Sequence, residues 1–106
     1  MTRLESRLAA LAAAGETATY GALARDLGLR VGELTAAIEA LMEEDARKGC
    51  PLRAAVCEGR FSGGMPAKGF FDKVAELGID ASDPAAFVAA QRAALFAAAR
   101  PATSAE

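Results

Sequence analysis

The chain has 106 residues, of which 53% are hydrophobic and 25% are charged, with 12 basic and 14 acidic side chains. This length and composition predict one globular domain and exclude wholesale disorder and collagen-like repeats. Because the chain has no histidine, Ser-His-Asp and Cys-His nucleophiles and histidine-bound metals are excluded. Two cysteines, Cys50 and Cys57, are too few for a four-thiolate zinc site. We therefore expect no enzymatic activity, no metal and no cofactor.

The apolar stretches of the sequence are short or rich in alanine. No basic start followed by a continuous apolar run opens the chain, and the alanine-rich stretch near the C-terminus is broken by Gln91 and Arg92. A membrane-spanning helix needs about 20 predominantly apolar residues. The sequence therefore predicts no signal peptide, no membrane span and a location in the reducing cytoplasm.

The first half of the chain has the pattern of three helices and one short strand. Leucines at helical spacing predict a helix over 3–14, and β-prone residues predict a short edge strand over 17–20. A short second helix is expected over 21–27, ending at Gly28. The third helix, over 31–48, has the clearest periodicity, with apolar residues at Val31, Leu34, Ile38, Leu41 and Met42.

The second half predicts a β-hairpin followed by two helices. Alternating apolar residues over 52–57 indicate a strand, and a return strand to Phe61 would complete the hairpin. A short helix is expected around 70–77, and a last helix begins at Pro84, capped by Ser82 or Asp83. Residues 1–100 are thus predicted to form one domain and 101–106 a frayed tail.

This order of elements resembles a winged helix-turn-helix domain. The resemblance is carried by Tyr20-Gly21-Ala22-Leu23-Ala24, in which small, inward-facing residues permit close helix packing. From Tyr20 to Phe71 the chain is also similar to uncharacterised bacterial helix-turn-helix modules, some of which accompany restriction-type nucleases. The resemblance implies a mainly α fold with a small β-hairpin (α+β), extended by additional C-terminal helices.

The same opening motif resembles the DNA-binding half of alkyltransferase-like proteins. Those proteins carry a Pro-Cys-His-Arg motif or a related one, which a chain without histidine cannot contain. Here Cys50 lies between Gly49 and Pro51 instead. Alkyltransferase activity is therefore excluded.

A winged-helix resemblance implies double-stranded DNA as a partner, with the third helix in the major groove. Charge opposes this, because residues 31–52 carry five acidic and only two basic side chains. The remaining basic groups gather near the helix-helix turn and the hairpin, and they include Arg53 and Lys73. The residues predicted to contact DNA are Arg25, Arg30, Thr35, Arg60 and Lys68.

Two other functions stay open. A protein-protein interaction module that does not bind DNA is favoured by the acidic third helix and the apolar last helix. An enzyme would need a carboxylate pair or Cys57, and no spacing singles out either. The leading prediction is a small, non-catalytic regulatory protein associated with DNA.

The last helix is apolar around most of its circumference, which normally means burial on more than one side. Leu95 and Phe96 lie about 100° apart on a helical wheel. Phe87, Leu95 and Phe96 are therefore predicted to contact a second copy or a partner protein, with a homodimer as the leading arrangement.

Three further expectations concern residues outside the last helix. Tyr20 is expected to pack against the protein rather than stack on bases, and the acidic run 43–45 is expected to face solvent. Both cysteines are expected to be at least half-buried.

Overall fold

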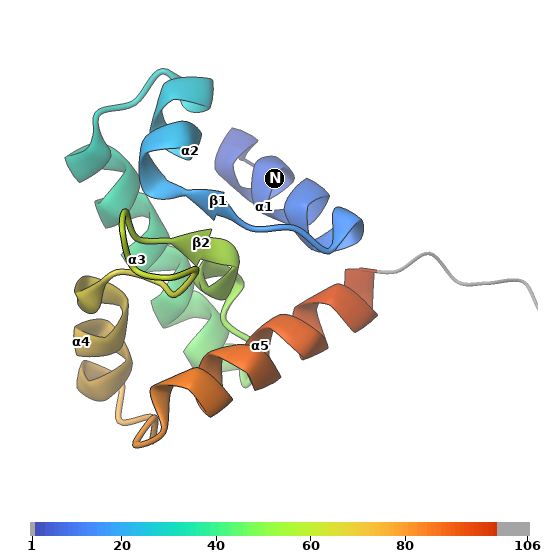
Figure 1. Cartoon of the computed structure of the whole chain (residues 1–106), viewed down its shortest axis with the longest axis vertical. Helices are drawn as coiled ribbons and strands as arrows, with labels where there is room; N and C mark the ends of the chain where they lie inside the picture. The colour runs from blue at the N-terminus through green and yellow to red at the C-terminus, as the bar shows by residue number, and fades with distance from the viewer. Residues whose placement is uncertain (1, 100–106) are drawn as a thin grey trace, which may run out of the picture.

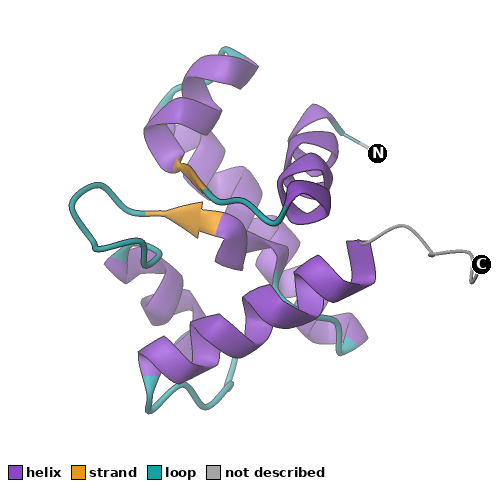
Figure 2. Cartoon of the chain, turned by 45° about the vertical axis from the view of Figure 1, so that its right-hand side comes forward, coloured by secondary structure: helices purple, strands orange, loops and turns teal. Residues whose placement is uncertain are grey.

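Helices form most of the structure, a computed structural model that describes residues 2–99 (Figure 1). Two very short strands lie between them, near the middle of the molecule (Figure 2). The elements in chain order are α1 (Arg3–Ala14), β1 (Ala18–Thr19), α2 (Tyr20–Leu27), α3 (Val31–Lys48), the 3₁₀ helix η1 (Arg53–Val56), β2 (Cys57–Glu58), α4 (Lys68–Glu76) and α5 (Pro84–Ala99).

Local sequence sets the boundaries of the first three helices as predicted. The Thr19 hydroxyl caps α2 by accepting a hydrogen bond from the Ala22 amide at 3.1 Å. Gly28 then ends this helix at a φ of 68°, a left-handed angle that glycine adopts without strain. At the start of α3, the Glu33 carboxylate accepts from the Arg30 amide at 2.8 Å. The short connection over 28–30 therefore fixes the orientation of α3 relative to α2.

A single hydrophobic core joins all the helices. The 3₁₀ helix η1 lies at its centre and packs against α1, α3 and α5. Helix α1 also packs against α5, so the first and last helices of the described chain close the core together. The largest fully buried side chains are Leu8, Leu23, Leu34, Met42, Leu52, Val56, Val74, Val88 and Cys57.

The predicted β-hairpin is wrong. Among residues 2–99 the two strands are β1 and β2, which pair in parallel with Ala18 opposite Cys57 and Thr19 opposite Glu58. Most of the segment predicted as the first hairpin strand forms η1, and no return strand follows β2. The architecture is therefore mainly α with a small parallel pair, within the α+β class.

Burial explains why alternation misled the prediction. Ala54, Ala55 and Val56 are consecutive and all buried, so the apolar residues at alternate positions do not mark one buried face of a strand. The chain then turns away at Gly59, where an added Cβ would lie 2.9 Å from the Cα of Ala67. This close approach replaces the return strand with a folded loop over 59–67.

The last two helices lie where the sequence predicts them. Asp83, rather than Ser82, caps α5 through a hydrogen bond from the Ala86 amide at 3.2 Å. The predicted frayed tail, 101–106, lies outside the described residues. None of the helices among residues 2–99 combines the length and the apolar character that a membrane-spanning helix needs.

Candidate nucleic-acid interface

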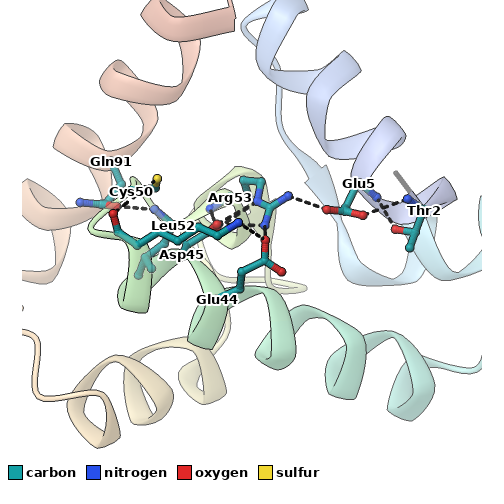
Figure 3. Close-up of polar contacts among 9 residues, drawn as sticks. Thr2, Glu5, Glu44, Asp45, Cys50, Leu52, Arg53 and Gln91 are labelled. Atoms are coloured by element: carbon teal, nitrogen blue, oxygen red, sulfur yellow. Dashed lines mark hydrogen bonds and ion pairs between the residues drawn. The ribbon is translucent and has the colours of Figure 1, made fainter.

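Several basic side chains are held in contacts inside the molecule, and Arg53 is the most completely engaged. Its guanidinium pairs with Asp45 at 2.9 Å, with Glu5 at 2.9 Å and with Glu44 at 3.4 Å (Figure 3). Its backbone amide also donates to Asp45 at 3.0 Å. The Asp45 side chain is only 5% exposed. Arg53 therefore joins α1, α3 and η1 and is not free to bind a partner.

This cluster corrects the prediction that residues 43–45 face solvent. Glu43 is exposed, but Asp45 is buried, and all three carboxylates in the run form ion pairs. The hydrogen bonds that the Arg53 guanidinium donates to Asp45 and to Glu5 raise the pKa of Arg53. The pKa of Glu5 falls to about 2, first because it accepts the Thr2 amide hydrogen bond and then because it pairs with Arg53.

Other cations are also engaged within the protein. Lys73, predicted as part of the basic set, is buried and pairs with Glu43 and Glu76, both at 2.5 Å. Lys68, a predicted DNA contact, pairs with Asp72 at 2.9 Å although its side chain is 87% exposed. Helix-surface pairs of this kind are weak, so Lys68 can still exchange Asp72 for another anion.

Two of the remaining arginines line one groove. Arg25 on α2 and Arg60 in the 59–67 loop have no salt bridge in the described chain, and they lie around the same depression. Figure 1 shows α2, the start of α3 and the loop after β2 on one side of the molecule. We call this depression the cationic groove; its lining residues are Thr19, Tyr20, Gly21, Ala22, Arg25, Val31, Gly59, Arg60 and Ala67.

The other predicted DNA-contacting residues lie close to this groove. Thr35 lines a neighbouring apolar depression of about 170 Å³. Three residues, Tyr20, Val31 and Ala67, line both depressions. Arg30 and Lys68 are each adjacent in sequence to one of these shared residues, and Arg30 forms no salt bridge among residues 2–99. The apolar depression is lined by Tyr20, Val31, Thr35, Ile38, Glu39, Met42, Ala67, Gly69 and Phe70.

Tyr20 has a structural role between the two depressions. Its hydroxyl accepts a hydrogen bond from the Ala67 amide at 3.4 Å and so joins α2 to the end of the loop. Burial raises the pKa of Tyr20 to about 12. The tyrosine is part of the packing, as the sequence predicted, rather than a free aromatic face.

Sequence reasoning missed the two exposed apolar residues of this face. Val31 is 53% exposed and Phe61 is 93% exposed, and they are the only large hydrophobic residues of the described chain that are exposed. The guanidinium carbon of Arg60 lies 5.0 Å from the centre of the Phe61 ring. The available signal is an aromatic residue directly before the turn residues Ser62, Gly63 and Gly64, whereas the predicted hairpin places Phe61 at the end of a return strand.

The residues predicted to form a dimer or partner interface lie against the protein's own core. Phe87, Leu95 and Phe96 are all partly buried there, and the ring of Phe87 lies 6.4 Å from that of Phe70. Helices α1 and η1 pack against α5, and Phe70 of α4 lies beside Phe87, so the protein's own core takes up part of each of these side chains. What α5 leaves exposed is mostly alanine.

The cysteines differ from one another. Cys57 is buried, as expected, and burial raises its pKa to about 12. Cys50 is exposed, contrary to the prediction that both would be at least half-buried.

Comparison of the chain with protein families, with curated proteins and with solved structures finds no match.

Proposed function

We propose that this protein is a small, non-catalytic regulatory protein that binds double-stranded DNA through the cationic groove. The observation that supports this most is the position of Arg25 and Arg60. They come from separate elements and line one depression, while Arg53, Lys73 and other cations are used inside the molecule. Arginines without acidic partners are the groups that displace counterions from DNA phosphates.

The acidic third helix opposes binding less than its sequence suggests. Glu43, Glu44 and Asp45 are each paired with a basic side chain, and Glu33 accepts a backbone hydrogen bond at the helix start. Glu39 remains, lining the apolar depression. With few free cations, the expected affinity is that of non-specific binding, a Kd of about 10⁻⁴ to 10⁻⁶ M.

The proposed arrangement is that of a helix-turn-helix protein with a modified wing. Helices α2 and α3, joined through Gly28, would approach the duplex with the start of α3 foremost. The folded loop over 59–67 would contact the backbone in place of a hairpin. Arg25, Arg30, Arg60 and Lys68 would contact phosphates, and Thr35 would approach the base edges.

Fluorescence anisotropy with a short random-sequence duplex tests this function. Four phosphate contacts predict that binding weakens about 150-fold between roughly 50 and 200 mM salt. Arg25→Ala and Arg60→Ala should each weaken binding and reduce the slope of log affinity against log salt by about 1. Arg47→Ala is the matched control, because Arg47 also forms no salt bridge in the described chain but lies at the other end of α3. The proposal fails if no variant changes the slope or if Arg47→Ala changes it equally.

A protein-protein interaction module is the second candidate, and the apolar depression favours it. Its lining includes Val31, Ile38, Met42 and Phe70, and Val31 is exposed. Arginine and aromatic residues are also the side chains enriched at protein interfaces. Absence of DNA binding at about 50 mM salt, where electrostatic binding is strongest, would favour this alternative.

A further inference from the structure

The loop between β2 and α4 presents an aromatic ring to solvent. Phe61 is 93% exposed, and Arg60 lies against its ring. Transfer of a phenyl ring out of water lowers the free energy, so the exposure of Phe61 is unfavourable for the isolated chain. Figure 2 shows the loop as a separate projection between α2 and α4. The ring is therefore accessible to a large, flat ligand.

The backbone at Phe61 is strained as well. Its φ of 59° lies in the left-handed region, and it is the only residue other than glycine with a positive φ in the described chain. Aromatic residues rarely adopt this region because Cβ crowds the backbone. Such conformations persist only where the surrounding structure enforces them, and they concentrate at ligand-binding sites.

Several hydrogen bonds hold the loop in this form. The Gly59 amide donates to the Met65 carbonyl at 2.8 Å, and the Ser62 hydroxyl bonds to the carbonyls of both residues. Arg92 reaches from α5 to the Gly64 carbonyl at 2.7 Å. The loop is therefore preformed, and presenting Phe61 requires no ordering step on binding.

Charge and shape indicate the ligand. Arg60 lines the cationic groove with Arg25, so an anionic backbone would lie beside the ring. In nucleic acids each nucleotide carries a phosphate next to a planar base, as Arg60 lies next to Phe61 in the loop. Aromatic side chains stack on bases or enter between base steps. We infer that Phe61 stacks on the bases of DNA while Arg60 contacts the adjacent phosphate, and that the protein therefore prefers duplexes with an unpaired nucleotide.

This preference follows from the cost of opening the base stack. An intact duplex must be unstacked before a ring can enter, whereas unpaired bases already expose a face. The inference rests on the proposed DNA binding and adds the type of DNA that the groove selects. Stacking of one base on an aromatic ring corresponds to roughly tenfold in affinity.

Two matched duplexes test the inference, one fully paired and one with a two-nucleotide bulge. Anisotropy at low salt should give the wild-type protein a roughly tenfold preference for the bulged duplex. Phe61→Ala should remove the preference and retain salt-dependent binding to the paired duplex. Phe61→Trp should keep the preference. Because the natural chain has no tryptophan, the emission of the new residue reports stacking directly and should be quenched by the bulged duplex.

The other outcomes separate the two proposals. If Phe61→Ala keeps the wild-type preference, or if the emission of Phe61→Trp is unchanged on saturation, Phe61 does not stack and this inference is overturned while DNA binding stands. If the wild-type protein binds neither duplex, the proposed function and the inference both fail. Circular dichroism of each variant establishes that loss of binding does not come from unfolding.

Discussion

Arg53 and Asp45 form the most buried ion pair of the described chain, with Nη2 of the arginine 2.9 Å from Oδ1 of the aspartate. The arginine amide donates to the same carboxylate, so one side chain fixes both the direction of η1 and its distance from α3. The three arginines at or near the cationic groove, Arg25, Arg30 and Arg60, form no salt bridge in the described chain. Arg53, which joins three elements, is partly buried, whereas Arg25 and Arg60 line the surface groove without an acidic partner in the described chain.

Replacing Arg53 should strongly destabilise the fold. Arg53→Met retains the aliphatic packing but leaves the Asp45 carboxylate buried without its cation, which predicts a loss of about 3 kcal/mol in the free energy of unfolding. Urea denaturation followed by circular dichroism measures this loss. Arg47→Met, on the exposed last turn of α3, should change stability by less than about 0.5 kcal/mol. Equal midpoints for the two variants would contradict the assigned role.

Stability should fall in acid, and Glu5 should contribute to the fall. Its folded pKa of about 2 lies below the ordinary value of 4.5, so its contribution is complete above pH 4.5 and disappears as the pH approaches 2. Glu5→Gln keeps an acceptor for the Thr2 amide and removes the charge. Urea midpoints between pH 7 and pH 2 should therefore vary less in this variant than in the wild type. Glu16→Gln, at an exposed position, should follow the wild-type curve.

Removing the strained aromatic should not destabilise the protein. Phe61→Gly relieves the left-handed backbone and removes an exposed ring, and the gain is partly offset by the flexibility of glycine in the unfolded chain. The free energy of unfolding of the variant should equal that of the wild type or exceed it by at most about 1 kcal/mol. A thermal melt compares the two proteins. A clear drop in melting temperature would show that Phe61 stabilises the fold and would weaken its assignment to a ligand.

The two cysteines should react at very different rates. Cys50 is exposed, whereas Cys57 is fully buried and its pKa is raised to about 12. Because the thiolate is the reactive form, a thiol reagent at neutral pH should modify one residue rapidly and the second only after unfolding. Cys50→Ser should abolish the rapid phase. A rapid phase in that variant would mean that η1 and β2 open readily.

The helices were predictable because their signals are local. Leucine spacing, the glycines that follow each of the first three helices and Pro84 all act within a few residues. The segment over 53–58 was not predictable, because its form depends on packing against α1, α3 and α5. Arg53 illustrates the limit: its partners Glu5 and Asp45 come from different helices, and only the tertiary fold brings them together.

The candidate site was predictable only in part, because local sequence identifies basic residues but not which of them the tertiary fold brings together. A turn position made Arg25 and Arg30 candidates, and the second half of the chain supplied Arg60, but no pattern could indicate that Arg25 and Arg60 share a groove. Lys73 lies in the same sequence region as Lys68 but is buried against Glu43 from another helix. Which cations are free therefore depends on the fold, whereas which cations exist is plain from the sequence.

An NMR titration of the ¹⁵N-labelled protein with duplex DNA tests the central claim most directly. At about 50 mM salt, amide shifts should change over residues 20–35 and 59–69, which surround the cationic groove, and should reverse as salt is raised. Residues 3–14 of α1 and 84–99 of α5 should remain unchanged and serve as the internal control. Shifts confined to α1 and α5, or no shifts at any DNA concentration, would contradict the assignment of this face to DNA.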